Sequence, residues 1–293
     1  MDKAVSVIFG ILCIYSVSCT DGTKIKTDYE RLKLKGRVQY ITETYFLPLV
    51  SGDTIKRGER TSNATSFYES SDDELFSSYE TKVYFDRNGN IRECYMDDSA
   101  SDFHFKETFE YDGNLLINKL GLLSGEFFYR EIYRYDSKNR ETERSFFDSE
   151  KNIFESVILE YPDKNTLIEK IHTKSEYSDF ERETRFENAL PVSLESRIDP
   201  VNILEKWSGE YDTQGQLVLS KFYDAQSNLL QYAKYSYDGH GNELECSTFS
   251  PGDELLEKHE YRYKYDSCGN WTQQVSITDG YPEIIMLRNI IYY

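Results

Sequence analysis

Histidines and cysteines are the side chains of this protein best suited to chemistry. Imidazoles can ligate metals or act as general bases, and the chain has four, at His104, His172, His240 and His259. They share no spacing of the kind that zinc sites use; two fall in predicted strands and one in a predicted turn. We therefore expect the histidines to be structural and predict no metal site.

A cysteine thiolate can act as a nucleophile when a base or a cation lies beside it. Three cysteines lie beyond the N-terminal segment, at Cys94, Cys246 and Cys268. The local sequence supplies no base for any of them, and an odd number does not indicate a disulfide framework. At most one pair could bridge, and Cys246 with Cys268 is the pair that a meander of strands would allow.

Carboxylates could supply a general acid and a general base. The clusters Asp72-Asp73-Glu74 and Asp97-Asp98 are examples, but a chain with 52 acidic residues forms such clusters freely, and exposed loops are their expected setting. Nucleophile elbows, His-Glu-x-x-His helices and phosphate loops do not occur in the sequence. We therefore predict no catalytic residue, no cofactor and no enzymatic activity.

Calcium is a further possibility, because Asp86-x-Asn88-x-Asn90 places oxygen donors at alternate positions. An EF-hand loop has its glycine directly after the third donor and a glutamate at the twelfth position, whereas here Gly89 precedes Asn90 and Glu93 comes too early. Turn formation alone explains these residue types.

The same aspartate belongs to a recurring phrase, in which an aromatic residue and Asp are followed by two variable residues, Gly and Asn. Its full copies are Phe85-Asp86-Arg87-Asn88-Gly89-Asn90, Tyr237-Asp238-Gly239-His240-Gly241-Asn242 and Tyr265-Asp266-Ser267-Cys268-Gly269-Asn270. Looser copies include Tyr111-Asp112, Tyr135-Asp136, Phe147-Asp148, Tyr161-Pro162-Asp163, Tyr211-Asp212 and Tyr223-Asp224. Asp favours the first position of a type I turn, and Gly tolerates positive φ. Recurrence at about a dozen residues indicates one strand and one turn per unit.

Between the turns, apolar and charged residues alternate as in strands. In residues 103–111 the aromatic positions Phe103, Phe105, Phe109 and Tyr111 share one face. The predicted fold class is all-β: a long antiparallel β-meander of about sixteen strands, with two or three more before Asp86. Open sheets beyond roughly ten strands curl or split, so we expect a twisted, curled or partly closed sheet. One short turn of helix is expected within residues 27–35, and the apolar residues 283–293 are expected to cap an edge.

The N-terminus has the features of an export signal. Lys3 precedes a short apolar run, and small residues come before Cys19. This pattern resembles a bacterial lipoprotein signal, in which the cysteine becomes the lipidated first residue, here Cys19. Ser16-x-Ser18 would also suit an ordinary signal peptidase, which would give a secreted protein. The predicted organisation is a signal peptide over residues 1–18, a tether over 19–33 and a repeat array over 34–293.

The net charge of −18 restricts the partners of the protein. Nucleic acids and anionic lipids are bound by clustered Lys and Arg, so we expect neither as a ligand, and we expect membrane contact only through the lipid anchor. The acidic residues are spread along the strands, which predicts solvated outer faces.

The phrase Tyr-x-Tyr-Asp-x-x-Gly-Asn, at residues 235–242 and 263–270, resembles the YD repeat of the RHS proteins. From about Leu34 to the C-terminus the chain is similar to small YD-repeat lipoproteins of Bacteroidetes. Large RHS proteins carry long arrays that wrap into a shell around a toxin. Here Asn90, Asn242 and Asn270 stand where RHS repeats usually have Arg, and the array is too short to enclose a cargo. The resemblance implies strand-turn architecture but not the shell function.

Two functions stay open at this point. The first is a non-enzymatic binding module of the cell envelope, in which tyrosines together with Trp207 and Trp271 hold a glycan or a protein. The alternative is a structural or assembly component of the envelope without a dedicated ligand. The expected location is the outer membrane, on its periplasmic or surface side, with secretion as the alternative. Exposed rings on a concave face would favour the binding module, and a sheet covered on both faces would favour the structural component.

Overall fold

The computed structural model of the protein describes residues 25–62, 79–98, 103–174, 179–198 and 202–293. Within them the chain forms one short helix and a sheet of 19 strands. The elements are α1 (Asp28–Arg31), β1 (Val38–Ser51), β2 (Thr54–Thr61), β3 (Glu80–Phe85), β4 (Ile91–Asp98), β5 (Phe103–Asp112), β6 (Leu115–Leu123), β7 (Glu126–Tyr135), β8 (Glu141–Phe147), β9 (Ile153–Asp163), β10 (Thr166–Thr173), β11 (Phe180–Glu187), β12 (Leu190–Arg197), β13 (Ile203–Tyr211), β14 (Leu217–Tyr223), β15 (Leu229–Tyr237), β16 (Glu243–Phe249), β17 (Leu255–Tyr265), β18 (Trp271–Thr278) and β19 (Tyr281–Tyr292). The strand count agrees with the sequence prediction, and α1 lies where a turn of helix was predicted.

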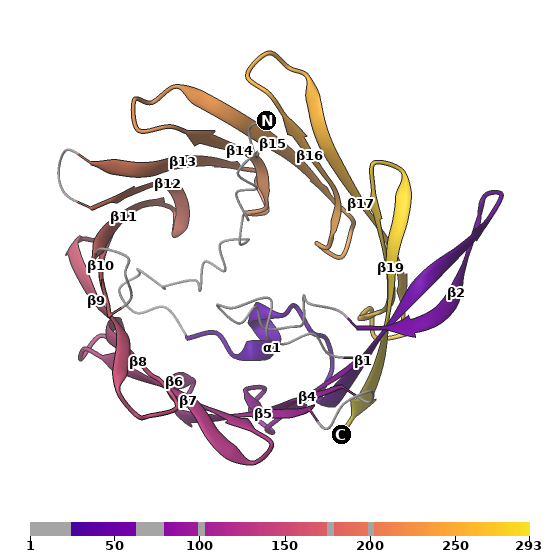
Figure 1. Ribbon diagram of the computed structural model, residues 1–293, viewed down its shortest axis with the longest axis horizontal. Helices are drawn as coiled ribbons and strands as arrows, with labels where there is room; N and C mark the ends of the chain where they lie inside the picture. The colour runs from indigo at the N-terminus through magenta and orange to yellow at the C-terminus, as the bar shows by residue number, and fades with distance from the viewer. Residues whose placement is uncertain (1–24, 63–78, 99–102, 175–178, 199–201) are drawn as a thin grey trace.

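The strands form a meander that closes on itself. From β3 to β19 each strand pairs antiparallel with the next in the chain, and β1 pairs both with β3, through residues 40–44, and with β19. The prediction of a twisted, curled or partly closed sheet is therefore wrong, because the protein is a closed antiparallel barrel, seen as a ring in Figure 1. A meander of this length would otherwise leave two unpaired edges, and closure removes both. The last strand, β19, was predicted to cap an edge; instead it pairs with β18 and β1 and closes the barrel.

One hairpin, formed by β1 and β2, projects from the barrel. The second half of β1 turns away from the ring and pairs with β2, which has no other partner among the described strands (Figure 1). Phe46, near its base, and Ile55, next to its turn, pack on a small apolar cluster of Val275, Ile277 and Ile285 on β18 and β19. The hairpin thus projects from the ring while these two side chains contact β18 and β19.

The aspartate of the repeated phrase shapes the turn that follows it. Asp86 Oδ1 accepts hydrogen bonds from the backbone amides of Asn88 and Asn90, at 2.8 and 2.9 Å. The same two bonds recur at Asp136, Asp148, Asp212, Asp238 and Asp266. The fourth residue of the turn has positive φ, 94° at Gly89, where an L side chain would be strained. The Asp-x-Asn-x-Asn pattern is therefore explained by hydrogen bonds within the turn.

The tyrosine of the phrase connects neighbouring hairpins. In four copies its hydroxyl donates to a backbone carbonyl at the start of the preceding strand, at 2.7 to 2.8 Å, in contacts that we call the tyrosine clips. The clips pair Tyr135 with Leu116, Tyr161 with Glu141, Tyr211 with Pro191, and Tyr237 with Leu217. Where the clips occur, the structural repeat is therefore a pair of strands, which is two of the units that the sequence spacing defines, and one tyrosine of each pair has a structural role.

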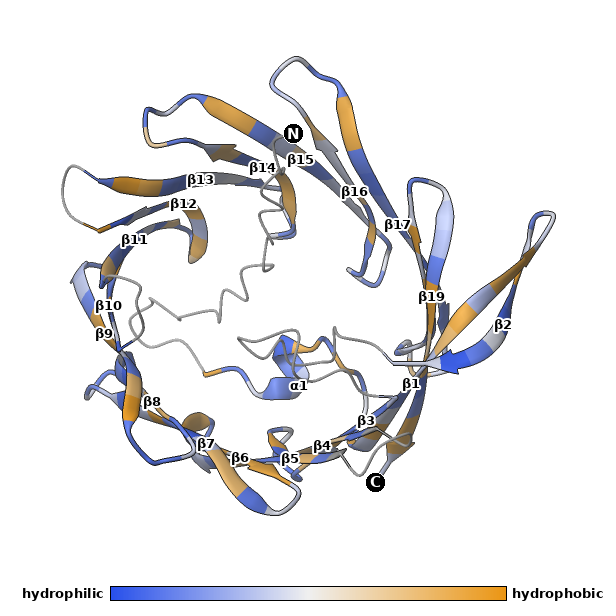
Figure 2. Ribbon diagram, in the orientation of Figure 1, coloured by the Kyte–Doolittle hydropathy of each residue, from blue (hydrophilic) through white to orange (hydrophobic). Residues whose placement is uncertain are grey.

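The inner face of the barrel is identified by α1, which lies inside the ring (Figure 1). Tyr29 and Leu32 of this segment pack against a core that includes Ile41, Val83 and Phe85. Alternate side chains along each strand point the other way, and Figure 2 shows hydrophobic and hydrophilic residues alternating along the strands.

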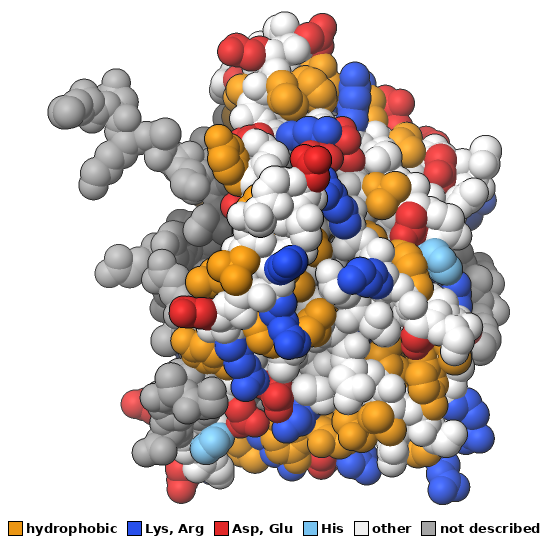
Figure 3. Space-filling model, turned by 90° about the vertical axis from the view of Figure 1, so that its right-hand side faces the viewer, with side chains coloured by type: hydrophobic (Ala, Val, Ile, Leu, Met, Phe, Trp, Pro, Cys, Tyr) orange, Lys and Arg blue, Asp and Glu red, His pale blue; other side chains and the backbone are white. Residues whose placement is uncertain are grey.

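The outer face carries charges of both signs. Lys258 lies 3.0 Å from Glu245, and Arg134 lies 3.5 Å from Glu143. Figure 3 shows cationic, acidic and apolar side chains mixed over one side of the molecule. No helix in the described part of the chain is long and apolar enough to cross a bilayer.

Candidate binding wall on the inner face of the barrel

The histidines of the sequence analysis lie apart from one another. Each has a local partner: His104 contacts Asp97 at 2.9 Å, His172 contacts Asp179 at 2.9 Å, His240 stacks on Tyr265 with ring centroids 4.1 Å apart, and His259 contacts Thr278 at 3.0 Å. Among the described residues no three His, Cys, Asp or Glu side chains group as metal ligands would.

The cysteines of the described chain are all free thiols. Cys94 is buried, Cys246 is half-buried and Cys268 is exposed, so the bridge that the sequence left open between the last two is not formed. Burial raises the pKa of Cys94 well above its ordinary value, which makes this thiol inert. Cys19 and the acidic cluster at residues 72–74 lie outside the described residues.

Aromatic rings gather on the inner face of β15, β17 and β18. Strand register places Tyr235 beside Cys246 and Cys246 beside His259, and it places Tyr263 beside Gln274. The rings of this surface are half-buried, and we call it the aromatic wall: Tyr235, Tyr237, Tyr261, Tyr263 and Trp271.

Two hydrogen bonds hold rings of the aromatic wall in place. Gln274 Nε2 donates to the hydroxyl of Tyr263 at 3.0 Å, and the hydroxyls of Tyr235 and Ser220 are 3.0 Å apart. Tyr263 and Trp271 pack with ring centroids 6.1 Å apart and planes inclined by 55°. The wall is therefore an ordered aromatic surface with polar groups at its edge, and not a loose patch.

Glu243 lies at the centre of the aromatic wall. Burial raises the pKa of its carboxyl group from 4.5 to about 7, and the nearby His259 opposes this only in part. Its charge in turn raises the pKa values of Tyr237 and Tyr261 on either side, after the larger effect of their own burial. Glu243 makes no hydrogen bond or ion pair within the described structure.

Two other carboxylates on the inner face, Glu43 and Glu107, are paired. Glu43 accepts two hydrogen bonds from Arg288, at 2.9 and 2.7 Å, across the seam between β1 and β19. Glu107 lies 2.9 Å from Lys119, although its second oxygen is buried without a partner. Glu243 differs from both because no Lys or Arg side chain forms an ion pair with it in the described structure, and a largely buried carboxylate without such a partner destabilises a fold.

Sequence reasoning missed Glu243, although a signal was present. The residue that follows the Asn of the repeated phrase begins the next strand, and it is Ile91 in the first full copy and Trp271 in the third. In the second full copy this position is Glu243. A charged residue at a repeat position that otherwise holds an apolar side chain is the pattern that identifies it.

Neither a family model nor a curated protein matches the chain. Among solved structures, it is similar to a porin-like protein from Bacteroides uniformis, with 12% identity, a TM-score of 0.29, and coverage of 64% of this chain and 96% of that one. A porin-like protein from Bacteroides vulgatus gives 9% identity, a TM-score of 0.31, and coverage of 87% and 98%. The TcdB2-TccC3-Cdc42 structure gives 11% identity, a TM-score of 0.19, and coverage of 67% and 14%. Overlaps of this extent say nothing about function.

Proposed function

We propose that the protein is an exported binding protein of the cell envelope that holds a neutral glycan on its aromatic wall. The single observation that supports this most is Glu243, an unneutralised carboxyl group among four tyrosines. A carboxylate accepts hydrogen bonds from sugar hydroxyls, and flanking rings stack on the apolar faces of sugars. The net charge of −18 disfavours an anionic glycan.

The energetics of Glu243 support a role in binding. Raising a carboxyl pKa by burial lowers the stability of the folded protein. Side chains that destabilise the fold without a structural partner are typical of functional sites. A ligand hydroxyl would supply the hydrogen bond that the described structure does not give this carboxyl group.

Binding of a panel of neutral oligosaccharides to the purified protein tests this function. For any oligosaccharide that binds, Tyr261→Leu should raise the Kd by about tenfold, because a central ring contact is removed. Tyr281→Ala is the control, since this tyrosine is 77% exposed at the start of β19 and does not belong to the wall. Glu243→Gln should abolish the change in affinity expected as pH passes through about 7. A failure of every neutral glycan to bind, or equal losses for Tyr261→Leu and Tyr281→Ala, would reject the proposal.

The envelope location rests on the N-terminal sequence. The signal-like residues 1–18 and the candidate lipid site Cys19 support export and anchoring of the protein. Protease treatment of intact cells, comparing the native chain with Cys19→Ala, tests this. Membrane association that is lost in Cys19→Ala supports the anchor, and digestion of the native chain from outside places it on the surface. An unchanged distribution of the variant contradicts lipidation.

A second candidate function is assembly with another envelope protein, and the projecting hairpin favours it. It exposes Leu47, Leu49 and Val50 at 48%, 59% and 58% of their surface. Apolar side chains grouped on a projecting element are typical of protein contacts, and a strand edge such as that of β2 can pair with another chain. Crosslinking in cells with native protein and with Leu49→Asp would identify such a partner. Identical crosslinks in both would exclude this surface.

A further inference from the structure

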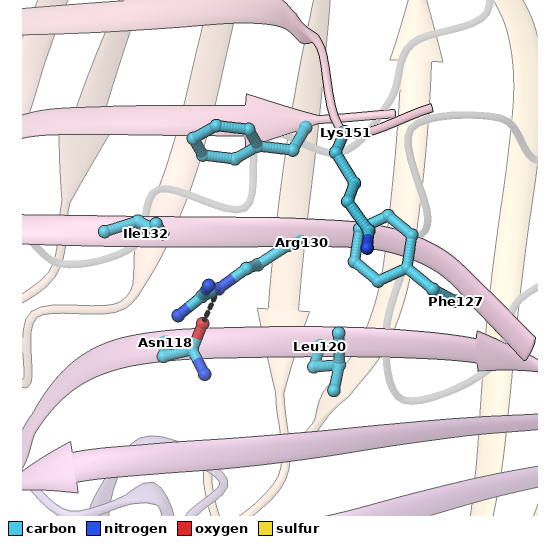
Figure 4. Close-up of a pocket in the computed structure, with 7 residues that line it drawn as sticks. Asn118, Leu120, Phe127, Arg130, Ile132 and Lys151 are labelled. Carbon is cyan, nitrogen blue, oxygen red and sulfur yellow. Dashed lines mark hydrogen bonds between the residues drawn. The ribbon is translucent and has the colours of Figure 1, made fainter. Parts of the chain in front are cut away.

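The outer face of the barrel has a hollow on the side formed by β6, β7 and β8 (Figure 4). Its volume is about 560 Å³, within the range of small-molecule sites. Strand register pairs Leu120 with Arg130 and Arg130 with Phe147, so these side chains share one face. The alternate residues Gly121 and Tyr129 face the inner core, which places the hollow on the outside.

The lining of the hollow is mainly apolar. Leu120 and Ile132 form part of it, with the rings of Phe127 and Phe147 beside them. In Figure 4 the side chains of Arg130 and Lys151 extend over this apolar surface from β7 and from the turn after β8.

Both cations at the hollow lack an acidic partner within the described structure. Arg130 Nε donates to Asn118 Oδ1 at 2.7 Å, and Lys151 Nζ lies 5.7 Å from the centre of the Phe127 ring. Elsewhere on the outer face, cations such as Lys170 and Lys221 have a carboxylate within 4 Å.

The backbone at Lys151 is strained, as it is at Asn139 and Ser227 in the equivalent turns. Lys151 occupies the fourth position of the turn that begins at Asp148, with a φ of 66°. Full copies of the repeat place glycine there, for example Gly89 and Gly241, because positive φ strains an L residue. A lysine at this position therefore costs stability in the turn and brings its ammonium group over the hollow.

We propose that this hollow binds a single-chain aliphatic carboxylate, such as a medium-chain fatty acid. The apolar chain would lie on Leu120, Ile132 and Phe147, and the carboxylate would pair with Arg130 and Lys151. Charge complementarity selects the anionic head group, because the site presents two cations and no acid in its lining. The site is separate from the aromatic wall, since it lies on the outer face of β6 to β8 whereas the wall is on the inner face of β15 to β18.

Isothermal titration of the purified protein with decanoate, kept below its micelle concentration, tests the proposal. Decyltrimethylammonium, with the same chain and the opposite charge, should not bind at the hollow. Lys151→Gly restores the residue type that the turn favours, so it should fold at least as well as the native chain. It should weaken decanoate binding by about fivefold, the effect of losing one partly exposed charge pair.

Two further variants make the outcome decisive. Leu120→Asn should also weaken decanoate binding, because it removes apolar surface from the hollow. Lys221→Gln, which removes a paired cation from the outer face, should leave the Kd of decanoate unchanged. Equal binding of decanoate and decyltrimethylammonium, or an unchanged Kd in Lys151→Gly, would overturn the proposal, as would a failure of decanoate to bind at all.

Discussion

The pKa of Glu243 leads to a quantitative prediction for stability. Burial raises the pKa of this carboxyl group from 4.5 in the unfolded chain to about 7 in the folded barrel. Each pKa unit corresponds to about 1.4 kcal/mol, so ionised Glu243 lowers the free energy of unfolding by roughly 3 kcal/mol. Replacing it with the neutral isostere in Glu243→Gln should remove this penalty.

The gain in the free energy of unfolding of Glu243→Gln should increase with pH. Near pH 4 the carboxyl group is protonated in both states, so native protein and Glu243→Gln should differ little. As pH rises from 4.5 to about 7, the unfolded chain releases its proton first, and the native protein loses stability relative to the variant. Above about pH 7 the difference should reach its full value, up to about 3 kcal/mol.

Urea denaturation at about pH 4 and about pH 8 measures this difference. Glu245→Gln is the matched control, because Glu245 lies on the same strand, faces outward, and has its pKa lowered by hydrogen bonds from Ser247 and Lys258. A lowered pKa stabilises the fold at higher pH, so Glu245→Gln should lose stability there. The loss should be less than about 1 kcal/mol, since this carboxylate is exposed and screened. A gain in Glu243→Gln that is the same at both pH values would refute the reasoning.

Three other substitutions test the structural devices of the barrel. Tyr211→Phe removes a tyrosine clip and should lower the free energy of unfolding by about 1 kcal/mol in urea titrations; no loss would show that the clip is dispensable. Gly89→Ala should cost about 1 to 2 kcal/mol, because its φ is 94° and a Cβ would lie 2.7 Å from the Tyr29 ring; rapid proteolysis near α1 is the readout, and native resistance would contradict it. Arg288→Met should cost about 3 to 5 kcal/mol by leaving Glu43 buried without its partner, and adding Glu43→Gln should recover much of that loss in thermal unfolding, whereas additive losses would argue against a coupled pair.

Local features of the fold could be predicted from sequence, but closure could not. The Asp and Gly of each repeated phrase define turns by local hydrogen bonds and by φ, so strand number and order follow from residues a few positions apart. Closure depends on β1 meeting both β3 and β19, and the ion pair of Glu43 with Arg288 lies at that junction. Neither residue belongs to a repeated phrase, and their contact joins opposite ends of the chain.

The candidate site was predictable only in part. The sequence indicated that tyrosines share one face, but it could not divide them between clips and the aromatic wall. A clip forms where a hydroxyl reaches a carbonyl of the preceding strand, as that of Tyr211 does, whereas Tyr261 lies beside an unpaired carboxylate, and Tyr237 takes part in both. Glu243 was visible as a departure from the repeat, but its burial comes from strands that the sequence cannot place.

The pairing of β1 with β19 has a consequence for how the protein folds. Val38 pairs with Tyr292, and the hydroxyl of Tyr293 donates to the carbonyl of Phe85. The residues that are synthesised last therefore form the contacts with the first strands. Hairpins can form one after another as the chain is synthesised or exported, because their contacts are local. The final step must bring together strands separated by nearly the whole chain, at a large cost in loop entropy. Until it occurs, β1 and the growing end present open edges, and a chain that stops before β19 keeps them permanently and is prone to aggregate.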